Sequence, residues 1–152
     1  MLNAPDFREL LSLFRSNSVR FLVVGGYAVM RYSEPRYTKD LDLWVSADPR
    51  NAQSVFAALK AFGAPLQGLT PEDFAHEGYF YQMGAPPLRV DIIMSIAGMK
   101  FDEVWQRRED TTVEGVVIPF ISKTDLIRSK EAAGRPQDLI DVQNLKKTLQ
   151  GR

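Results

Sequence analysis

Residues 21–45 have the sequence FLVVGGYAVMRYSEPRYTKDLDLWV, which carries much of the information about the fold. The first four residues are apolar and end at Gly25 and Gly26, a pattern that predicts a buried strand followed by a tight turn. A short helix is expected directly after the turn, at residues 27–32. Backbone N–H groups at such a helix start can bind an anion such as a triphosphate, although a glycine pair is also an ordinary turn.

The end of the same stretch, residues 40–45, alternates strictly between the two faces of a predicted strand. Asp40 and Asp42 share one face with a tryptophan, and the other face is apolar, so the strand is predicted to lie in the centre of a sheet. Two carboxylates held this close repel each other unless a cation neutralises them. The alternative is a solvated strand face, which is the usual place for acidic residues.

A third aspartate, Asp91, lies inside another apolar stretch, residues 88–94, on the face opposite Val90 and Ile92. This stretch also predicts a strand. A single acid in an apolar strand has two explanations. It belongs to a polar site, or it is a buried acid that pairs with a base such as Arg89.

The remaining segments predict a mixed α/β protein. Further helices are expected at residues 7–14, starting near Asn3 and Pro5, and at 49–62, 101–107, 122–133 and 136–149. Further strands are expected at 79–83, joined to 88–94 by a hairpin through Gly84, Ala85, Pro86 and Pro87, and within 113–121. We predict one domain over residues 1–152, with a core at about 18–121 and a helical C-terminal part at about 122–150.

The composition is typical of a soluble globular protein, with 45% hydrophobic and 25% charged residues among 152. Basic and acidic residues number 19 each, so no overall field attracts nucleic acid, and no DNA partner is expected. Neither a membrane span nor a signal-peptide pattern is present, so we expect a cytoplasmic protein without a membrane partner. Without cysteine, and with His76 as the one histidine, a bound metal would have oxygen ligands, which suit Mg²⁺, Mn²⁺ or Ca²⁺.

The combination of these motifs resembles the nucleotidyltransferase superfamily that includes DNA polymerase β. Gly25 and Gly26 resemble its phosphate-binding turn, Asp40 and Asp42 its metal-binding pair, and Asp91 its third carboxylate. The resemblance implies an α/β (α+β) nucleotidyltransferase fold, with a mixed central sheet flanked by helices and with helices at the C-terminus. Gly26 stands where the family often has serine, which removes a hydroxyl near the phosphates.

The resemblance also implies an activity. Asp40, Asp42 and Asp91 would be the catalytic residues and would hold two Mg²⁺ ions, with Mn²⁺ as the alternative. A nucleoside monophosphate would pass from a nucleoside triphosphate to an acceptor hydroxyl, with release of pyrophosphate. The acceptor is left open between a small molecule such as an aminoglycoside, a tRNA end and a protein side chain. The alternative function is a non-catalytic or partner-regulated nucleotide-binding module of a toxin–antitoxin or defence pair.

A second group of charged residues lies near the C-terminus, where Lys130, Arg135, Asp138 and Asp141 straddle the junction of two expected helices. It resembles the C-terminal motif of small bacterial nucleotidyltransferases related to the AbiEii toxins. That resemblance implies that Lys130, Arg135 and Asp138 bind the nucleotide, and it makes an antitoxin a candidate partner. A homodimer is a further expectation, because the chain has no obvious second domain for an acceptor. The equally weighted alternative is a salt bridge between Arg135 and Asp138 that caps and joins the two helices.

Two further groups have weaker ties to the site. Arg31, Arg36 and Lys39 lie between the glycine pair and the metal-binding strand and could face the triphosphate, but charged residues are usual in loops. The aromatic run at residues 79–81 could stack on a base, but such a run is more typical of a strand core.

Overall fold

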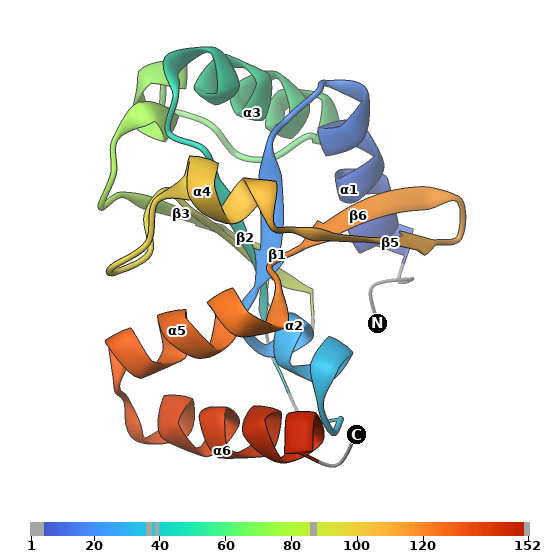
Figure 1. Ribbon diagram of the computed structural model, residues 1–152. Helices are drawn as coiled ribbons and strands as arrows, with labels where there is room; N and C mark the ends of the chain where they lie inside the picture. Colours follow the sequence, from blue (N-terminus) through green and yellow to red (C-terminus); the bar gives the residue numbers. More distant parts are fainter. Residues whose placement is uncertain (1–4, 36–37, 39, 86–87, 151–152) are drawn as a thin grey trace.

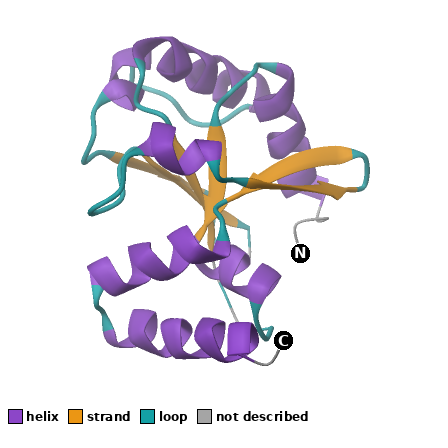
Figure 2. Ribbon diagram, in the orientation of Figure 1, coloured by secondary structure: helices purple, strands orange, loops and turns teal. Residues whose placement is uncertain are grey.

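A computed structural model describes residues 5–35, 38, 40–85 and 88–150 of the chain. Its centre is a six-stranded mixed sheet in the order β3-β4-β2-β1-β6-β5 (Figures 1 and 2). The predicted class, a mixed sheet flanked by helices, is confirmed. The strands are β1 (Phe21–Val24), β2 (Asp40–Val45), β3 (Phe80–Met83), β4 (Arg89–Ile93), β5 (Glu109–Val113) and β6 (Val116–Phe120). The helices are α1 (Pro5–Ser16), α2 (Gly25–Tyr32), α3 (Pro49–Phe62), the 3-10 helix η1 (Pro71–Ala75), α4 (Phe101–Gln106), α5 (Lys123–Ala133) and α6 (Pro136–Gln150).

The register of the central strands places polar residues in one row. β2 pairs antiparallel with β1 and parallel with β4, and β4 pairs antiparallel with the edge strand β3. Val24 lies opposite Asp42, Asp42 opposite Asp91, and Asp91 opposite Gln82. Residues opposite each other in a sheet point to the same face, so Asp42, Asp91 and Gln82 form a polar row across three strands, and Val24 continues it on β1 as an apolar residue.

The two faces of the sheet have different neighbours. In Figure 1, α1 and α3 lie at the top of the view and α2, α5 and α6 at the bottom. Leu41 and Leu43, which alternate with the aspartates, are fully buried, and Val90 on the same face shares a cavity wall with Phe7 of α1. The aspartates therefore point away from α1 and toward the side that carries α5 and α6.

Local signals set the ends of two helices where the sequence predicted them. The Asp48 side chain accepts a backbone N–H at the start of α3, and Gly63 ends this helix in the left-handed region with a φ of 91°. Ser122 caps α5 in the same way, and Gly134, with a φ of 65°, ends it. The chain turns at Gly134, so that α5 and α6 run side by side (Figure 1).

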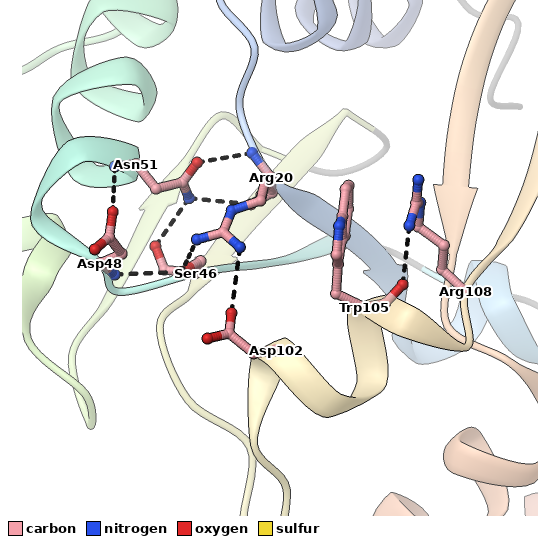
Figure 3. A network of polar contacts seen from close by, with 7 residues as sticks. All are labelled: Arg20, Ser46, Asp48, Asn51, Asp102, Trp105 and Arg108. Atoms are coloured by element: carbon pink, nitrogen blue, oxygen red, sulfur yellow. Dashed lines mark hydrogen bonds and ion pairs between the residues drawn. The ribbon is translucent and has the colours of Figure 1, made fainter.

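A polar network fixes the end of β1 and β2 that is remote from the aspartates (Figure 3). The buried Asn51 side chain accepts the Arg20 N–H at 2.7 Å and donates to the carbonyl oxygens of Arg20 at 3.0 Å and Ser46 at 2.9 Å. The Arg20 guanidinium donates to Asp102 of α4 at 3.3 Å. Because the Asn51 amide uses its acceptor and both of its donors, the network stabilises this end of the sheet without any ligand.

Two features differ from the sequence-based expectation. β1 passes into α2 at Gly25 without a separate turn, because the helix already begins at this residue. The strand β5 was not predicted, since its sequence, Glu-Asp-Thr-Thr-Val, is mostly polar. Asn3, Pro86 and Pro87, which belonged to the expected helix start and hairpin, lie outside the described residues. In the described part of the chain, no helix has the length and apolar character to cross a membrane.

Candidate active site

Three carboxylates gather on the face of the sheet that points toward α5 and α6. Asp40 and Asp42 come from β2 and Asp91 from β4, and one carboxylate oxygen of each lies within 4.8 Å of the other two. All three residues are partly buried. The parallel pairing of β2 with β4 produces this cluster, because it sets Asp42 directly beside Asp91. We call these three residues the carboxylate cluster; their role as ligands stays a prediction.

Asp42 has the most perturbed carboxyl group of the cluster. Burial raises its pKa, and the charges of Asp91 and Asp40 together with a hydrogen bond to Asp91 raise it further, to about 7 from the ordinary value of 3.8. The charge of Lys130 acts in the opposite direction. A proton on Asp42 therefore relieves part of the repulsion inside the cluster.

Arg89, at the start of β4, contacts the cluster. Its Nη2 donates to Asp40 Oδ2 at 3.0 Å, and its Nε lies 3.0 Å from Asp40 Oδ1 and 3.8 Å from Asp91 Oδ1. The contact is incomplete, because Arg89 Nε, Asp40 Oδ1 and Asp91 Oδ1 are buried and have no hydrogen-bond partner among the described residues. Three carboxylates facing one guanidinium leave the cluster with an excess of negative charge.

Gly25 brings the start of α2 against the carboxylate cluster. Its φ of 68° is left-handed, and a Cβ at this position would overlap Asp42 Oδ2 and lie 3.0 Å from the Asp42 carboxyl carbon. Val24, at the N-cap position, makes no side-chain hydrogen bond to the helix. The uncapped N–H groups of the first turn, which contains the buried Gly26, therefore lie beside the acids and offer an anion site.

The C-terminal charged residues form a second cluster at the α5–α6 junction. The buried Lys130 Nζ lies 3.3 Å from Asp138 Oδ1 and 3.0 Å from Asp141 Oδ2. Arg135 donates to Asp138 through Nε at 2.7 Å and through its backbone N–H at 3.2 Å. Burial raises the pKa of Asp138, but hydrogen bonds from Arg135 and the charge of Lys130 outweigh it, so the pKa is lowered from its ordinary value. Asp138 thus caps α6 and ties it to α5, and we call Lys130, Arg135, Asp138 and Asp141 the helix cluster.

A cavity of about 140 Å³ lies between the two clusters. Gly25 and Asp42 line one side, and Lys130, Arg135 and Asp138 line the other. The Arg135 side chain is 77% exposed, so its guanidinium is accessible from solvent although one edge is bonded to Asp138. The apolar part of the wall comes from Val24, Ile93, Ile96, Leu126 and Ala133, with Ser129 beside them. An anionic group in this cavity would meet the start of α2 and two cations.

The other residues singled out in the sequence have different positions. The Arg31 guanidinium lies over the rings of Tyr32 and Phe120, at 5.4 Å and 5.6 Å from the ring centroids, and so packs on β6. Arg36 and Lys39 lie outside the described residues. Among the aromatic residues of the run 79–81, Phe80 is 65% exposed, on the face of Asp91, whereas the Tyr81 hydroxyl donates to the Pro65 carbonyl oxygen on the other face.

Sequence reasoning did not assign several residues to the site. Asp141 was named in the C-terminal charged group but was given no role; it is a second partner of Lys130, one helical turn after Asp138 on the same face. Ile96 and Leu126 line the cavity from segments thirty residues apart, and no local pattern brings them together. Gln82 enters the polar row through the β3–β4 register, which the sequence did not specify.

The carboxylate cluster fits a hard divalent cation. Its donors are oxygens, they lie close together, and the buried Oδ1 atoms of Asp40 and Asp91 still lack hydrogen bonds within the described ranges. Oxygen donors are the preferred ligands of Mg²⁺ and Mn²⁺, and a positive ion would offset the charge repulsion that, together with burial as the larger cause, raises the pKa of Asp42.

Comparison with solved structures shows what the fold is similar to. The lincosamide antibiotic adenylyltransferase LnuA, with lincomycin bound, matches at a TM-score of 0.60 and 18% identity, over 94% of this chain and 96% of its own. ANT(2")-Ia in complex with adenylyl-2"-tobramycin matches at a TM-score of 0.58 and 14% identity, over 93% and 86%. An antigenic nucleotidyltransferase-like protein from Paracoccidioides brasiliensis matches at a TM-score of 0.54 and 19% identity, over 91% and 71%. At these identities the likeness establishes the fold.

The sequence comparisons identify the family. No curated protein sequence matches the chain. A family model described as "Nucleotidyltransferase of unknown function (DUF6036)" matches residues 6–149. The predicted resemblance to the nucleotidyltransferase superfamily is confirmed, and the chain belongs to this family of nucleotidyltransferases.

Proposed function

We propose that this protein is a Mg²⁺-dependent enzyme that transfers a nucleoside monophosphate from a nucleoside triphosphate to an acceptor hydroxyl. The observation that carries the proposal is the carboxylate cluster, whose buried Asp40 and Asp91 oxygens lack hydrogen bonds among the described residues. Its third member, Asp42, lines a cavity that is also lined by the uncapped start of α2 and by two cations. Anionic phosphates and a cation would each meet their complement there.

The three aspartates have distinct tasks in this proposal. Asp40 and Asp42 hold one ion, and the same pair with Asp91 holds a second, with Mn²⁺ able to replace Mg²⁺. Bound metal supplies charge neutralisation at the phosphates and lowers the pKa of the acceptor hydroxyl. The hydroxyl oxygen forms a bond to the α-phosphorus, the bond from that phosphorus to the bridging oxygen breaks, and pyrophosphate leaves. The hydroxyl proton passes to Asp91, which lies nearest to the open edge strand.

The triphosphate would bind between the start of α2 and the helix cluster. N–H groups of the first helical turn, at Gly25 and Gly26, donate to phosphate oxygens. Arg135 is the accessible cation and pairs with the phosphates directly. Lys130 and Asp138 hold α5 and α6 in place and contribute their charges from the cavity wall.

The acceptor would approach over the open edge of the same face. Gln82 is opposite Asp91, and Phe80, two residues earlier on β3, offers an exposed ring beside Ile93. A polar amide and an apolar ring together suit a small molecule with hydroxyl groups. The two antibiotic-modifying enzymes of similar fold support testing such acceptors first, with ATP as the donor. A tRNA end or a protein side chain is the alternative.

The test combines thermal stability with a transfer assay. Melting is measured with each of the four nucleoside triphosphates, with and without Mg²⁺, for the wild type and Asp42→Asn. We expect a Mg²⁺-dependent rise for the donor nucleotide that disappears in Asp42→Asn. The α-labelled form of that nucleotide is then incubated with hydroxyl-bearing acceptors, and label is expected in the acceptor together with released pyrophosphate. No shift with any nucleotide would instead favour the partner-regulated module.

Three expectations remain proposals beside this one. They are the relation of the helix cluster to the AbiEii-type group, a partner such as an antitoxin or a second copy of the chain, and the single-domain division of the chain. Analytical ultracentrifugation of the purified chain tests the homodimer, because a homodimer would have twice the monomer mass of 17.2 kDa.

A further inference from the structure

Arg89 lies beside the carboxylate cluster, on the same face of the sheet. It lies two residues before Asp91 on β4 and directly opposite Asp40 of β2, so its side chain is on the face of the aspartates. Its Nη2 and Nε are each 3.0 Å from one oxygen of Asp40, so both oxygens of that carboxylate face the guanidinium. A cation at Asp40 would meet a carboxylate that already has a positive partner.

The geometry of this contact differs from that of a structural ion pair in the same chain. Arg107 donates to both oxygens of the fully buried Asp125, through Nε at 2.9 Å and Nη2 at 3.1 Å, in the parallel two-bond arrangement that suits a guanidinium and a carboxylate. Arg89 donates one hydrogen bond, and its buried Nε forms none within the described part of the chain. Arg89 therefore brings a positive charge to Asp40 with fewer aligned hydrogen bonds than Arg107 gives to Asp125.

The carboxylate cluster needs a positive charge nearby because its three acids repel one another. Three carboxylates with oxygens within 4.8 Å of one another repel strongly in a partly buried site. One guanidinium offsets a single charge, whereas a divalent cation offsets two and binds oxygen without requiring hydrogen-bond alignment. Arg89 is thus a partial substitute for a metal ion at the same carboxylate.

We propose that Arg89 is an internal counter-ion that stabilises the carboxylate cluster in the metal-free protein and competes with a divalent cation for Asp40. This inference rests on the proposed function, in which the cluster binds that cation. It assigns Arg89 a positioning role that lowers metal affinity, and it predicts that removal of the guanidinium strengthens metal binding while it weakens the metal-free fold.

The test measures Mn²⁺ binding directly, by isothermal titration calorimetry, with Mn²⁺ alone as the probe. Arg89→Gln is compared with the wild type and with Arg108→Gln. Arg108 is a matched control, because its side chain is 31% exposed against 32% for Arg89 and it also pairs with an aspartate, Asp110, at 3.3 Å. We expect Arg89→Gln to bind Mn²⁺ about 5- to 20-fold more tightly than the wild type, and Arg108→Gln to bind within about twofold of it.

A second readout is the melting temperature. Arg89→Gln is expected to melt below the wild type without metal and to approach it in excess Mn²⁺, a recovery that loss of a merely structural contact would not give. If Arg89→Gln does not fold, Arg89→Lys replaces it. Lysine keeps the charge but offers a point charge in place of the planar fork, so a smaller gain in Mn²⁺ affinity, about two- to threefold, is expected.

The outcomes separate this inference from the proposed function. Unchanged or weaker Mn²⁺ binding by Arg89→Gln and Arg89→Lys, with a wild type that binds Mn²⁺, overturns the counter-ion role and leaves the metal site standing. An equal gain in Arg108→Gln also overturns it, because the effect would then be general electrostatics. Absence of binding in every variant rejects the metal site as well. A wild type that does not bind beside an Arg89→Gln that does would support the inference in its strongest form.

Discussion

The carboxylate cluster and the helix cluster face each other across one cavity, yet they use the same residue types in opposite ways. The helix cluster balances two acids with two bases, and its buried groups are bonded to one another. The carboxylate cluster sets three acids against one arginine and leaves buried oxygens without hydrogen bonds among the described residues. A self-satisfied cluster holds the scaffold, whereas an unsatisfied one is suited to a ligand.

The pKa shifts follow the same division. The pKa of Asp42 is raised to about 7, so its ionised form is disfavoured in the fold, whereas the pKa of Asp138 is lowered, so its ionised form is favoured. The first group lowers the stability of the metal-free protein at neutral pH, and the second contributes to it. Substitutions that separate these two effects are therefore the most informative.

The largest effect is expected from Lys130→Met. The change leaves Asp138 and Asp141 buried without their shared cation, which costs about 3–5 kcal/mol of unfolding free energy. Urea unfolding measures it. Lys146→Met is the control, because Lys146 pairs with Glu131 at 3.1 Å with both side chains about half exposed, and should cost less than about 0.5 kcal/mol. Equal small losses would show that the helix cluster is not structural.

Gly25→Ala should cost about 1–3 kcal/mol, because the left-handed φ of 68° disfavours alanine and the new Cβ would displace Asp42. Gly68→Ala separates the two causes. Gly68 has a φ of 78° with nothing within 4 Å of an added Cβ, so it carries the backbone cost alone. We expect calorimetry to show that Gly25→Ala loses Mn²⁺ binding and that Gly68→Ala keeps it. If both variants bound Mn²⁺, the backbone conformation at Gly25 would not be required for the metal site.

Asp42→Asn should act in the opposite direction on the metal-free protein. Removal of one of three clustered charges is expected to raise the free energy of unfolding by about 1–2 kcal/mol, after allowance for screening of a partly exposed site. The same variant should lose Mg²⁺-dependent nucleotide binding. A variant that is less stable than the wild type in metal-free buffer would identify Asp42 as a structural residue.

The pH dependence of the metal-free protein should distinguish the clusters with a smaller signal. Asp42 binds a proton more tightly in the folded than in the unfolded protein. Its contribution to the free energy of unfolding is therefore fully present below its ordinary pKa and falls as the pH rises to about 7, by about 1 kcal/mol or somewhat more. Asp138 has a lowered pKa, so its stabilisation is present above the ordinary value and is lost as pH falls below it. Urea midpoints between pH 4 and 8 should decline in the wild type and be flatter in Asp42→Asn.

The smallest change in stability is expected from Arg135→Gln. The side chain is 77% exposed, and the Arg135 N–H that Asp138 accepts is retained, so the loss should stay near 0.5 kcal/mol. Triphosphate affinity should nevertheless fall about three- to tenfold, because a charged hydrogen bond to phosphate is removed. Fluorescence titration with a labelled nucleotide checks this, and Arg128→Gln, on the far side of the α5 helix and also exposed, is the control. An equal loss of triphosphate affinity in Arg128→Gln would show that the loss comes from the change in net charge, not from a direct contact of Arg135 with the phosphates.

The sequence predicted those parts of the molecule that local patterns encode. Strict alternation in residues 40–45 and an acid in the apolar stretch around Asp91 were enough to place three carboxylates on strands, and capping signals at Ser122 and Gly134 gave the ends of α5. The polar strand β5 was not predicted, because an edge strand buries few side chains and therefore needs no alternation of apolar residues. Placement of Lys130 across the cavity from Asp42 depends on tertiary packing, which no local pattern specifies.

The direct passage from β1 into α2 makes the site intolerant of changes in chain length. With no loop between Val24 and Gly25, one inserted residue would rotate the helix by about 100° relative to the strand, since a turn takes 3.6 residues. The N–H groups of the first turn would then no longer point toward the aspartates. Any residue other than glycine at the position of Gly25 would place a Cβ against Asp42. The start of α2 and the two aspartates of β2 therefore form one unit that an insertion or deletion would disrupt as a whole.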